Sequence, residues 1–154
     1  MKMVIQRVTR ADVRVGGEVV GRIGGGFVIL VGLERGDDEA AVQRGAKRVA
    51  GLRAFEDAEG RINRDLSEVG GSVLAVSQFT LAGSIRRGRR PSFDNAMPGA
   101  AAEPLFERFV AELRAAGVTV ETGVFGAYME VELVNSGPVT LLWDDPPGGA
   151  AAAG

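Results

Sequence analysis

The chain has 154 residues, of which 45% are hydrophobic and 25% charged, with a formal net charge of -2 and neither Cys nor His. This length predicts one globular domain, and the missing residue types exclude a Ser-His-Asp triad, a Cys-His pair, disulfides and zinc held by imidazole or thiolate. The small negative charge argues against a protein that coats nucleic acid. No apolar run approaches the roughly 20 residues of a membrane span, and the N-terminus lacks a signal-peptide pattern. The absence of Cys fits the cytoplasmic protein that we expect.

The first third of the chain predicts strands. Residues 3–8 read as a strand that Arg7 interrupts, either as a solvated side chain at a sheet edge or as a residue with a functional role. Residues 13–23 predict a hairpin turning at Gly16-Gly17, a pair that suits two-residue turns. The glycines at 24–26 lead into the apolar stretch 27–33 instead of a helix, which excludes a phosphate-binding loop.

A helix is predicted next. Asp37 or Asp38 supplies its N-cap, and its apolar side chains recur at helical spacing as far as about Arg53. Residues 54–63 predict a short hairpin, and residues 65–71 predict a loop.

Residues 72–81, S-V-L-A-V-S-Q-F-T-L, begin as an apolar strand and then turn polar. Ser77, Gln78 and Thr80 stand where a buried strand would stay apolar. A break in an otherwise consistent local pattern indicates a functional site. These three residues are therefore our first site candidates.

A long polar connection, residues 82–98, carries four arginines within five positions and an aromatic residue; these are Arg86, Arg87, Arg89, Arg90 and Phe93. A run of like charges is most often a solvated surface loop. Long loops in compact domains are nevertheless often functional, and arginine beside an aromatic ring suits phosphate contact with base stacking. We favour contact between the loop 84–93 and RNA.

The last third centres on residues 123–140, which follow a predicted helix at 103–116 and a strand at 118–121. Apolar and polar side chains alternate from Ala127 to Leu133, as in a half-buried strand. The sequence Asn-Ser-Gly-Pro at 135–138 then predicts either an ordinary turn or a rigid elbow. Residues 146–154, P-P-G-G-A-A-A-A-G, predict a disordered tail after a domain of residues 1–145.

Two of these segments together resemble the signature motifs of the D-aminoacyl-tRNA deacylase family: S-Q-F-T-L at 77–81 and N-S-G-P-V-T at 135–140. The similarity extends to M-V-I-Q-R-V at 3–8, R-G-R-R-P-S-F at 87–93 and G-V-F-G-A-Y-M at 123–129, and covers residues 1 to about 144. About seven predicted strands and two helices indicate one α+β domain with mostly antiparallel sheets. The resemblance implies a three-layer β/β/α arrangement of this domain, working as a homodimer. We expect a tRNA 3′ acceptor end as partner, and no cofactor, metal, membrane or DNA.

The resemblance also implies how such an enzyme selects its substrate. The Gly137-Pro138 peptide is cis in this family, supported by Arg7, and its carbonyl groups enter the partner subunit's pocket. They accept hydrogen bonds from the amino group of a D-aminoacyl ester and collide with the side chain of an L one, which is selection by rejection. Glycine has no side chain to reject, so glycyl-tRNA, such as glycine mischarged on tRNA-Ala, is expected to be cleaved too.

The chemistry must work without histidine or cysteine. Nothing in the sequence could activate Thr80 as a nucleophile, so we assign Thr80 and the backbone amides of the motif to holding the ester carbonyl and expect the ribose 2′-hydroxyl to help activate water. Gln78, the second catalytic candidate, and Ser77 hydrogen-bond the substrate or brace the pocket. Three apolar residues line the pocket near the terminal adenine or belong to the core: Phe79, Phe125 and Met129.

Two alternatives stay open. A related deacylase carries a trans Gly-Pro and edits an L-amino acid mischarged on tRNA, but its first motif differs from S-Q-F-T-L. A non-catalytic RNA-binding module with this editing fold would suit the acidic composition. Turnover of D-aminoacyl-tRNA distinguishes both from the favoured function.

Overall fold

The structure is a computed structural model that describes residues 1–148. It has eight strands, three α-helices and one 3₁₀ turn, in the order β1 (Lys2–Val15), β2 (Glu18–Ile23), β3 (Gly26–Gly32), α1 (Glu39–Ala50), β4 (Phe55–Glu56), β5 (Ile62–Arg64), α2 (Leu66–Val69), β6 (Ser72–Ser77), η1 (Phe79–Ala82), α3 (Gly99–Ala115), β7 (Thr119–Thr122) and β8 (Glu130–Asp144). Within these residues, no helix is long and apolar enough to cross a membrane. The last six residues of the expected tail, 149–154, lie outside the described part.

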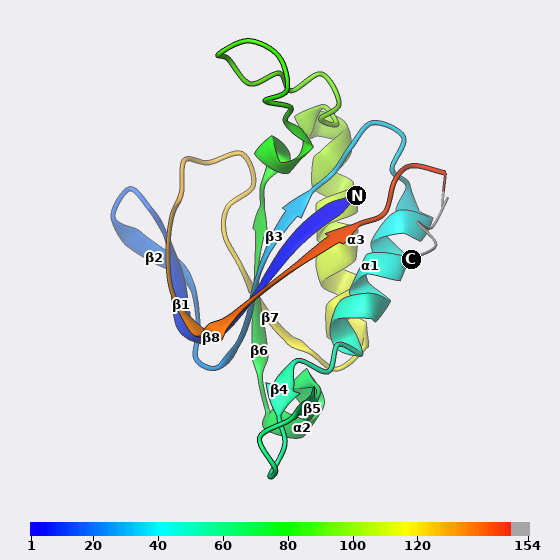
Figure 1. Cartoon of the computed structure of the whole chain (residues 1–154). Coiled ribbons are helices and arrows are strands. Elements are labelled where there is room, and N and C mark those ends of the chain that lie inside the picture. Colours follow the sequence, from blue (N-terminus) through cyan, green and yellow to red (C-terminus); the bar gives the residue numbers. More distant parts are fainter. Residues whose placement is uncertain (149–154) are drawn as a thin grey trace.

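Six strands form one mixed sheet in the order β2-β1-β3-β6-β7, with β8 paired to the other side of β1. β1 is antiparallel to β2, β3 and β8, whereas β6 is parallel to both β3 and β7. Parallel neighbours need a crossover, and α1 and α3 lie in the two crossing segments (Figure 1). The single α+β domain is confirmed. The sheet also contains two parallel strand pairs, β3–β6 and β6–β7, whereas mostly antiparallel pairing was expected.

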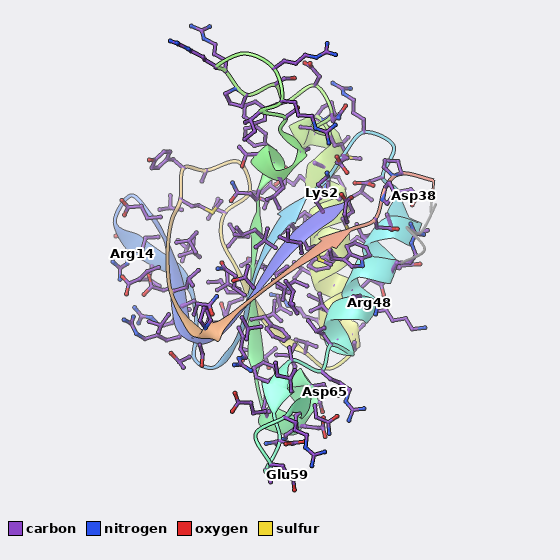
Figure 2. All side chains as sticks on the ribbon, viewed as in Figure 1. Lys2, Arg14, Asp38, Arg48, Glu59 and Asp65 are labelled. Carbon is purple, nitrogen blue, oxygen red and sulfur yellow. The ribbon has the colours of Figure 1, made fainter. Side chains whose placement is uncertain are left out.

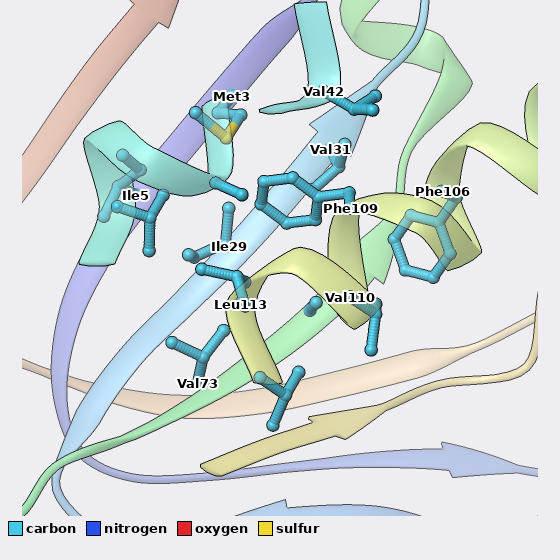
Figure 3. Packing of buried hydrophobic residues seen from close by; sticks show 14 of the residues in the cluster. Met3, Ile5, Ile29, Val31, Val42, Val73, Phe106, Phe109, Val110 and Leu113 are labelled. Carbon is cyan, nitrogen blue, oxygen red and sulfur yellow. The ribbon is translucent and has the colours of Figure 1, made fainter. Parts of the chain in front are cut away.

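Both long helices cover one face of the sheet. The side chains of Phe109 and Leu113 on α3 pack with Ile29 and Val31 of β3 and with Val73 of β6 (Figure 3). Removing these apolar surfaces from water stabilises the fold. The core therefore fixes β3 and β6 side by side, which positions the end of β6.

The other face of β3 belongs to a second apolar cluster. Val28 packs there with Val13 of β1 and Leu74 of β6, because neighbouring side chains of a strand point to opposite faces. The sheet curls around this cluster as a partly closed barrel: a Cβ at Gly21 of β2 would lie only 2.5 Å from the carbonyl oxygen of Thr122 in β7. Met129, directly before β8, and Leu133 in the first half of β8 pack against this cluster.

Helix boundaries differ from the sequence-based expectations in three places. α1 begins after its N-cap Asp38, whose side chain accepts from the Ala41 amide, but it ends at Ala50. Residues 65–71 contain a short helix with a capping box between Asp65 and Glu68. α3 begins at Gly99, about one turn before the predicted start, with Pro104 inside it. Figure 2 labels Asp38 and Asp65 beside these helix starts and Arg48 on the outer face of α1.

A candidate active site at the end of strand β6

The polar motif predicted from the sequence lies where β6 leaves the sheet. β6 ends at Ser77, and the chain turns at once into η1. The Gln78 amide still donates to the Val31 carbonyl at 2.7 Å, which ties the turn to β3. Gly32 makes this approach feasible, because a Cβ there would lie 2.7 Å from the Cβ of Leu81 and 3.0 Å from the carbonyl oxygen of Gln78.

A cavity of about 620 Å³ opens beside this turn. Its volume lies in the range of small-molecule and cofactor sites. Six of the predicted site residues line it, namely Ser77, Gln78, Phe79, Thr80, Phe125 and Met129. The sequence motifs at 77–81 and 123–129, far apart in the chain, therefore face one cavity.

Two polar side chains of the cavity are joined. The Gln78 side-chain amide donates a hydrogen bond to the Thr80 hydroxyl oxygen. A hydroxyl that accepts from an amide N–H keeps its own proton for another acceptor. At the start of η1, the first amides also have no acceptor within the turn itself. The Thr80 hydroxyl and the neighbouring amides are thus donors at the cavity edge.

The apolar site candidates combine a packing role with a place in the cavity wall. Phe125 is half-buried against Phe106 of α3, with ring centroids 6.1 Å apart. Met129 packs against the second core cluster. Phe79 differs, since 59% of it is exposed and its ring meets that of Phe93 at 5.2 Å in an edge contact.

The arginine-rich loop begins directly after η1. Its ends are joined by hydrogen bonds between the backbones of Ser84 and Ser92, at 2.7 and 2.9 Å. Phe93 packs on the backbone of Gly83, where a Cβ would lie 2.8 Å from its ring, and so attaches the loop to η1. The four arginines of the loop are exposed, and none of the salt bridges found within residues 1–148 involves them.

The Gly137-Pro138 elbow interrupts the ladder between β1 and β8. Thr140 pairs with Gln6 and Asn135 with Val8, so residues 136–139 face the single residue Arg7 and loop out of the sheet. The Asn135 side chain closes the loop by accepting from the Val139 amide at 2.7 Å and donating to the Val139 carbonyl at 3.1 Å. The Gly137–Pro138 peptide bond is cis, as the resemblance implied.

Arg7 braces the elbow from inside the molecule. It is only 8% exposed, and its guanidinium donates to the Ser136 carbonyl at 3.0 Å and to the Ala54 carbonyl at 2.8 Å. Arg7 and Ser136 line a different cavity, of about 500 Å³, beside Gly70 and Gly71. Of the alternatives for Arg7, the solvated side chain at a sheet edge is wrong.

The elbow and the cavity at Thr80 lie at opposite ends of β6. Arg7 pairs with Phe27, which pairs with Val73, whereas Ser77 stands four residues further along β6. Four residues of strand span about 13 Å. Figure 1 shows the β8 bend near the lower end of β6 and η1 at its upper end. Neither Gly137 nor Pro138 lines the cavity at Thr80 in this chain.

Several cavity residues were not among the sequence-based candidates. Phe106 and Ala102 come from α3, Met97 from the segment before it, and Tyr128 from the loop before β8. Phe106 belonged to the predicted apolar helix face, but periodicity alone does not say which end of that face meets a cavity. Within residues 1–148 no three acidic side chains gather in a way that could hold a metal ion.

The fold places the chain in a class of α+β proteins of known structure. It superimposes with a TM-score of 0.88 on the c-Myc DNA unwinding element binding protein, with 38% identity over 95% of this chain and 99% of that one. A structure described as a probable eukaryotic D-amino acid tRNA deacylase shares the fold, with a TM-score of 0.80 at 20% identity over 92% of this chain and 97% of that one.

Sequence relatives give the family. The family model described as D-Tyr-tRNA(Tyr) deacylase matches residues 4–144. A D-aminoacyl-tRNA deacylase of Symbiobacterium thermophilum is 62% identical over 94% of this chain and 95% of its own length, and that of Thermus aquaticus is 56% identical over 94% and 95%. The chain belongs to the D-Tyr-tRNA(Tyr) deacylase family.

Proposed function

We propose that this protein hydrolyses the ester bond between a D-amino acid and the 3′-terminal ribose of tRNA, releasing free tRNA and the D-amino acid. The observation that carries the proposal is that Ser77, Gln78, Phe79 and Thr80 line one cavity together with Phe125 and Met129. An aminoacyl nucleoside suits a mostly apolar cavity with a few polar groups at one edge. The names of the relatives at 62% and 56% identity support the same substrate class.

In this mechanism Thr80 positions the ester carbonyl and water is the nucleophile. The partner of the Thr80 hydroxyl is an amide N–H, which is a donor and therefore no general base. The hydroxyl proton and the first amides of η1 can donate to the oxygen on which negative charge develops. The ribose 2′-hydroxyl of the substrate assists the attacking water, a role that only RNA can supply.

We propose further that the elbow acts in the partner subunit of a homodimer. Its place about 13 Å along β6 from Ser77 means that it needs a second chain to reach such a cavity. β8 supplies an edge for pairing or packing, because among the described strands only β1 pairs with it. On the face of the sheet opposite the long helices, Val4 of β1 stands in register with Leu30 of β3 and Leu142 of β8, and Leu142 is 80% exposed. The three-layer β/β/α arrangement belongs to the same proposal.

The elbow would then sort substrates by chirality. Arg7 and Asn135 hold the loop at both sides through backbone contacts, so its carbonyl groups cannot move away from a colliding group. A D-aminoacyl ester offers its amino group to these oxygens, whereas an L one offers its side chain, which is rejected. Glycyl-tRNA passes because glycine lacks the rejected group.

Thr80→Ala is expected to lower kcat on D-aminoacyl-tRNA by about 100-fold, the effect of removing one donor to a developing oxyanion, while Thr80→Ser retains most activity. Single-turnover kinetics with both variants would measure this. Intact-mass spectrometry of the parent during turnover should show no acyl-enzyme. A trapped Thr80 ester, together with a loss near 10⁶-fold as for a missing nucleophile, would overturn the assignment. No turnover by the parent would favour the non-catalytic module instead.

Replacing Arg86, Arg87, Arg89 and Arg90 together by Gln is expected to weaken tRNA binding through lost phosphate contacts. The slope of log(kcat/KM) against log salt concentration should become shallower by up to about 3, since each phosphate contact to a single strand contributes about 0.7. Arg48→Gln, on the outer face of α1 (Figure 2), is the matched control. An unchanged slope in the fourfold variant would leave the loop as solvated surface.

A further inference from the structure

Exposed aromatic rings gather at one place on the described surface. Tyr128 is 90% exposed and Phe79 59%, and both line the cavity at Thr80. Phe93, 37% exposed, touches Phe79. The other aromatic residues of the chain are buried or half-buried. Single exposed apolar residues are ordinary on protein surfaces, but here two exposed rings line one cavity and the third contacts one of them.

Tyr128 is held at this opening by its own loop. The loop between β7 and β8 contains a turn in which the Ala127 amide donates to the Val124 carbonyl at 3.2 Å, with Gly126 at a φ of 76°. On one side of the turn Phe125 packs inward against Phe106, and on the other Met129 packs against the second core cluster. These two anchors leave the ring of Tyr128 directed away from the core.

The arginine-rich loop lies at the same end of the molecule. Figure 1 shows both connecting segments at the upper end of β6: the segment between η1 and α3 rises above η1, and the segment between β7 and β8 curves beside η1 on the left. Exposed rings beside unpaired arginines are the arrangement that binds single-stranded nucleic acid, since every base has a face that stacks on an aromatic ring and every phosphate attracts a guanidinium.

The proposed substrate supplies such a strand. If its terminal nucleoside and amino acid occupy the cavity, the unpaired nucleotide that precedes them must lie outside, at the opening. We propose that Tyr128 stacks on the base of this preceding nucleotide and so positions the RNA rather than the amino acid. This inference rests on the proposed function, but it concerns a contact that the aminoacyl nucleoside alone does not make.

The test compares two substrates that differ only in the upstream RNA: D-aminoacyl-tRNA and the corresponding D-aminoacyl-adenosine. Tyr128→Ala is expected to raise KM for the tRNA by about 5- to 160-fold, the loss of one base stacked on an aromatic ring, with kcat within about twofold. The KM for aminoacyl-adenosine should change at least five times less. Tyr128→Phe, which keeps the ring, should restore the KM for tRNA, and Val124→Ala in the same loop is the control.

Other results would overturn the inference. An equal rise in KM for both substrates would place the ring on the terminal nucleoside or the amino acid, and no change in either would leave Tyr128 without a contact. A halved mass of Tyr128→Ala in sedimentation would assign the ring to a protein interface. If the parent hydrolyses neither substrate, that result contradicts the proposed function but leaves the role of Tyr128 to be tested. Fluorescence anisotropy with uncharged tRNA then still decides about Tyr128, because its replacement by Ala must weaken that binding by the same factor.

Discussion

Gly137→Ala is expected to reduce the discrimination between D- and L-aminoacyl-tRNA by about 100-fold, which corresponds to about 2.7 kcal/mol of transition-state free energy. Gly137 has a φ of 128°, which side chains other than that of glycine rarely adopt. A Cβ there would also lie 2.9 Å from the Nη2 atom of Arg7 and 3.0 Å from a methyl carbon of Val139. The elbow must therefore move, and its carbonyl groups with it. Initial rates on matched D-, L- and glycyl-tRNA measure the effect.

Gly24→Ala is a suitable control for this variant, because a Cβ at Gly24 meets nothing within 4 Å. Mixing Gly137→Ala with Gln78→Ala provides a further check. If each elbow serves the partner's cavity, a mixed dimer holds one intact combination, and exchange of subunits should restore selective activity that neither variant has alone. Discrimination that stays at the parent value in Gly137→Ala would remove the elbow from the mechanism.

Leu142→Asp is expected to separate the subunits and to lower activity on D-aminoacyl-tRNA by at least 100-fold at micromolar enzyme. Leu142 is the most exposed of the apolar residues on β8. It pairs with Val4 of β1 and so belongs to the row of Leu30, Val4 and Leu142 that we assign to the dimer face. A carboxylate buried there without a partner opposes association. Sedimentation measures the mass, and circular dichroism verifies that the exposed position leaves the fold intact.

Ile62→Asp, a similar change on the exposed part of β5, should leave mass and activity unaltered. A Leu142→Asp protein of halved mass that remains fully active would show that one chain suffices. A protein of unchanged mass would place the dimer face elsewhere on the molecule.

Local chemistry made some elements of this fold predictable from the sequence. Asp38 caps α1 as expected, because a side-chain oxygen satisfies the free amides of the first turn. The capping box of Asp65 and Glu68 was a readable signal for α2 that the loop assignment overlooked. α3 begins earlier than predicted because Ala100, Ala101 and Ala102 favour a helix. Pro104, which was read as a first-turn residue, is tolerated further inside it.

Long-range pairing was less predictable. The continuous apolar run of β6 is typical of strands in parallel sheets, but a strand in the core of a sandwich shows the same run, so the parallel pairs with β3 and β7 were missed. The polar break at Ser77–Thr80 did mark the cavity, since it violates the pattern of a buried strand. Residues 77–80 lie beside Phe125 and Met129 because the chain crosses over through α3 between β6 and β7. Only the resemblance to the family's motifs predicted that these segments share one site. The role of Arg7 required the register between β1 and β8.

The strand β8 also limits how this chain can change in evolution. Its first residues follow the loop that walls the cavity, its middle holds the elbow, and its end carries Leu142. Because side chains alternate along a strand, inserting or deleting one residue upstream would turn every later side chain to the opposite face. Substrate pocket, chiral filter and subunit contact would then be lost together, so we expect length variation among homologues to be confined to the loops outside β8.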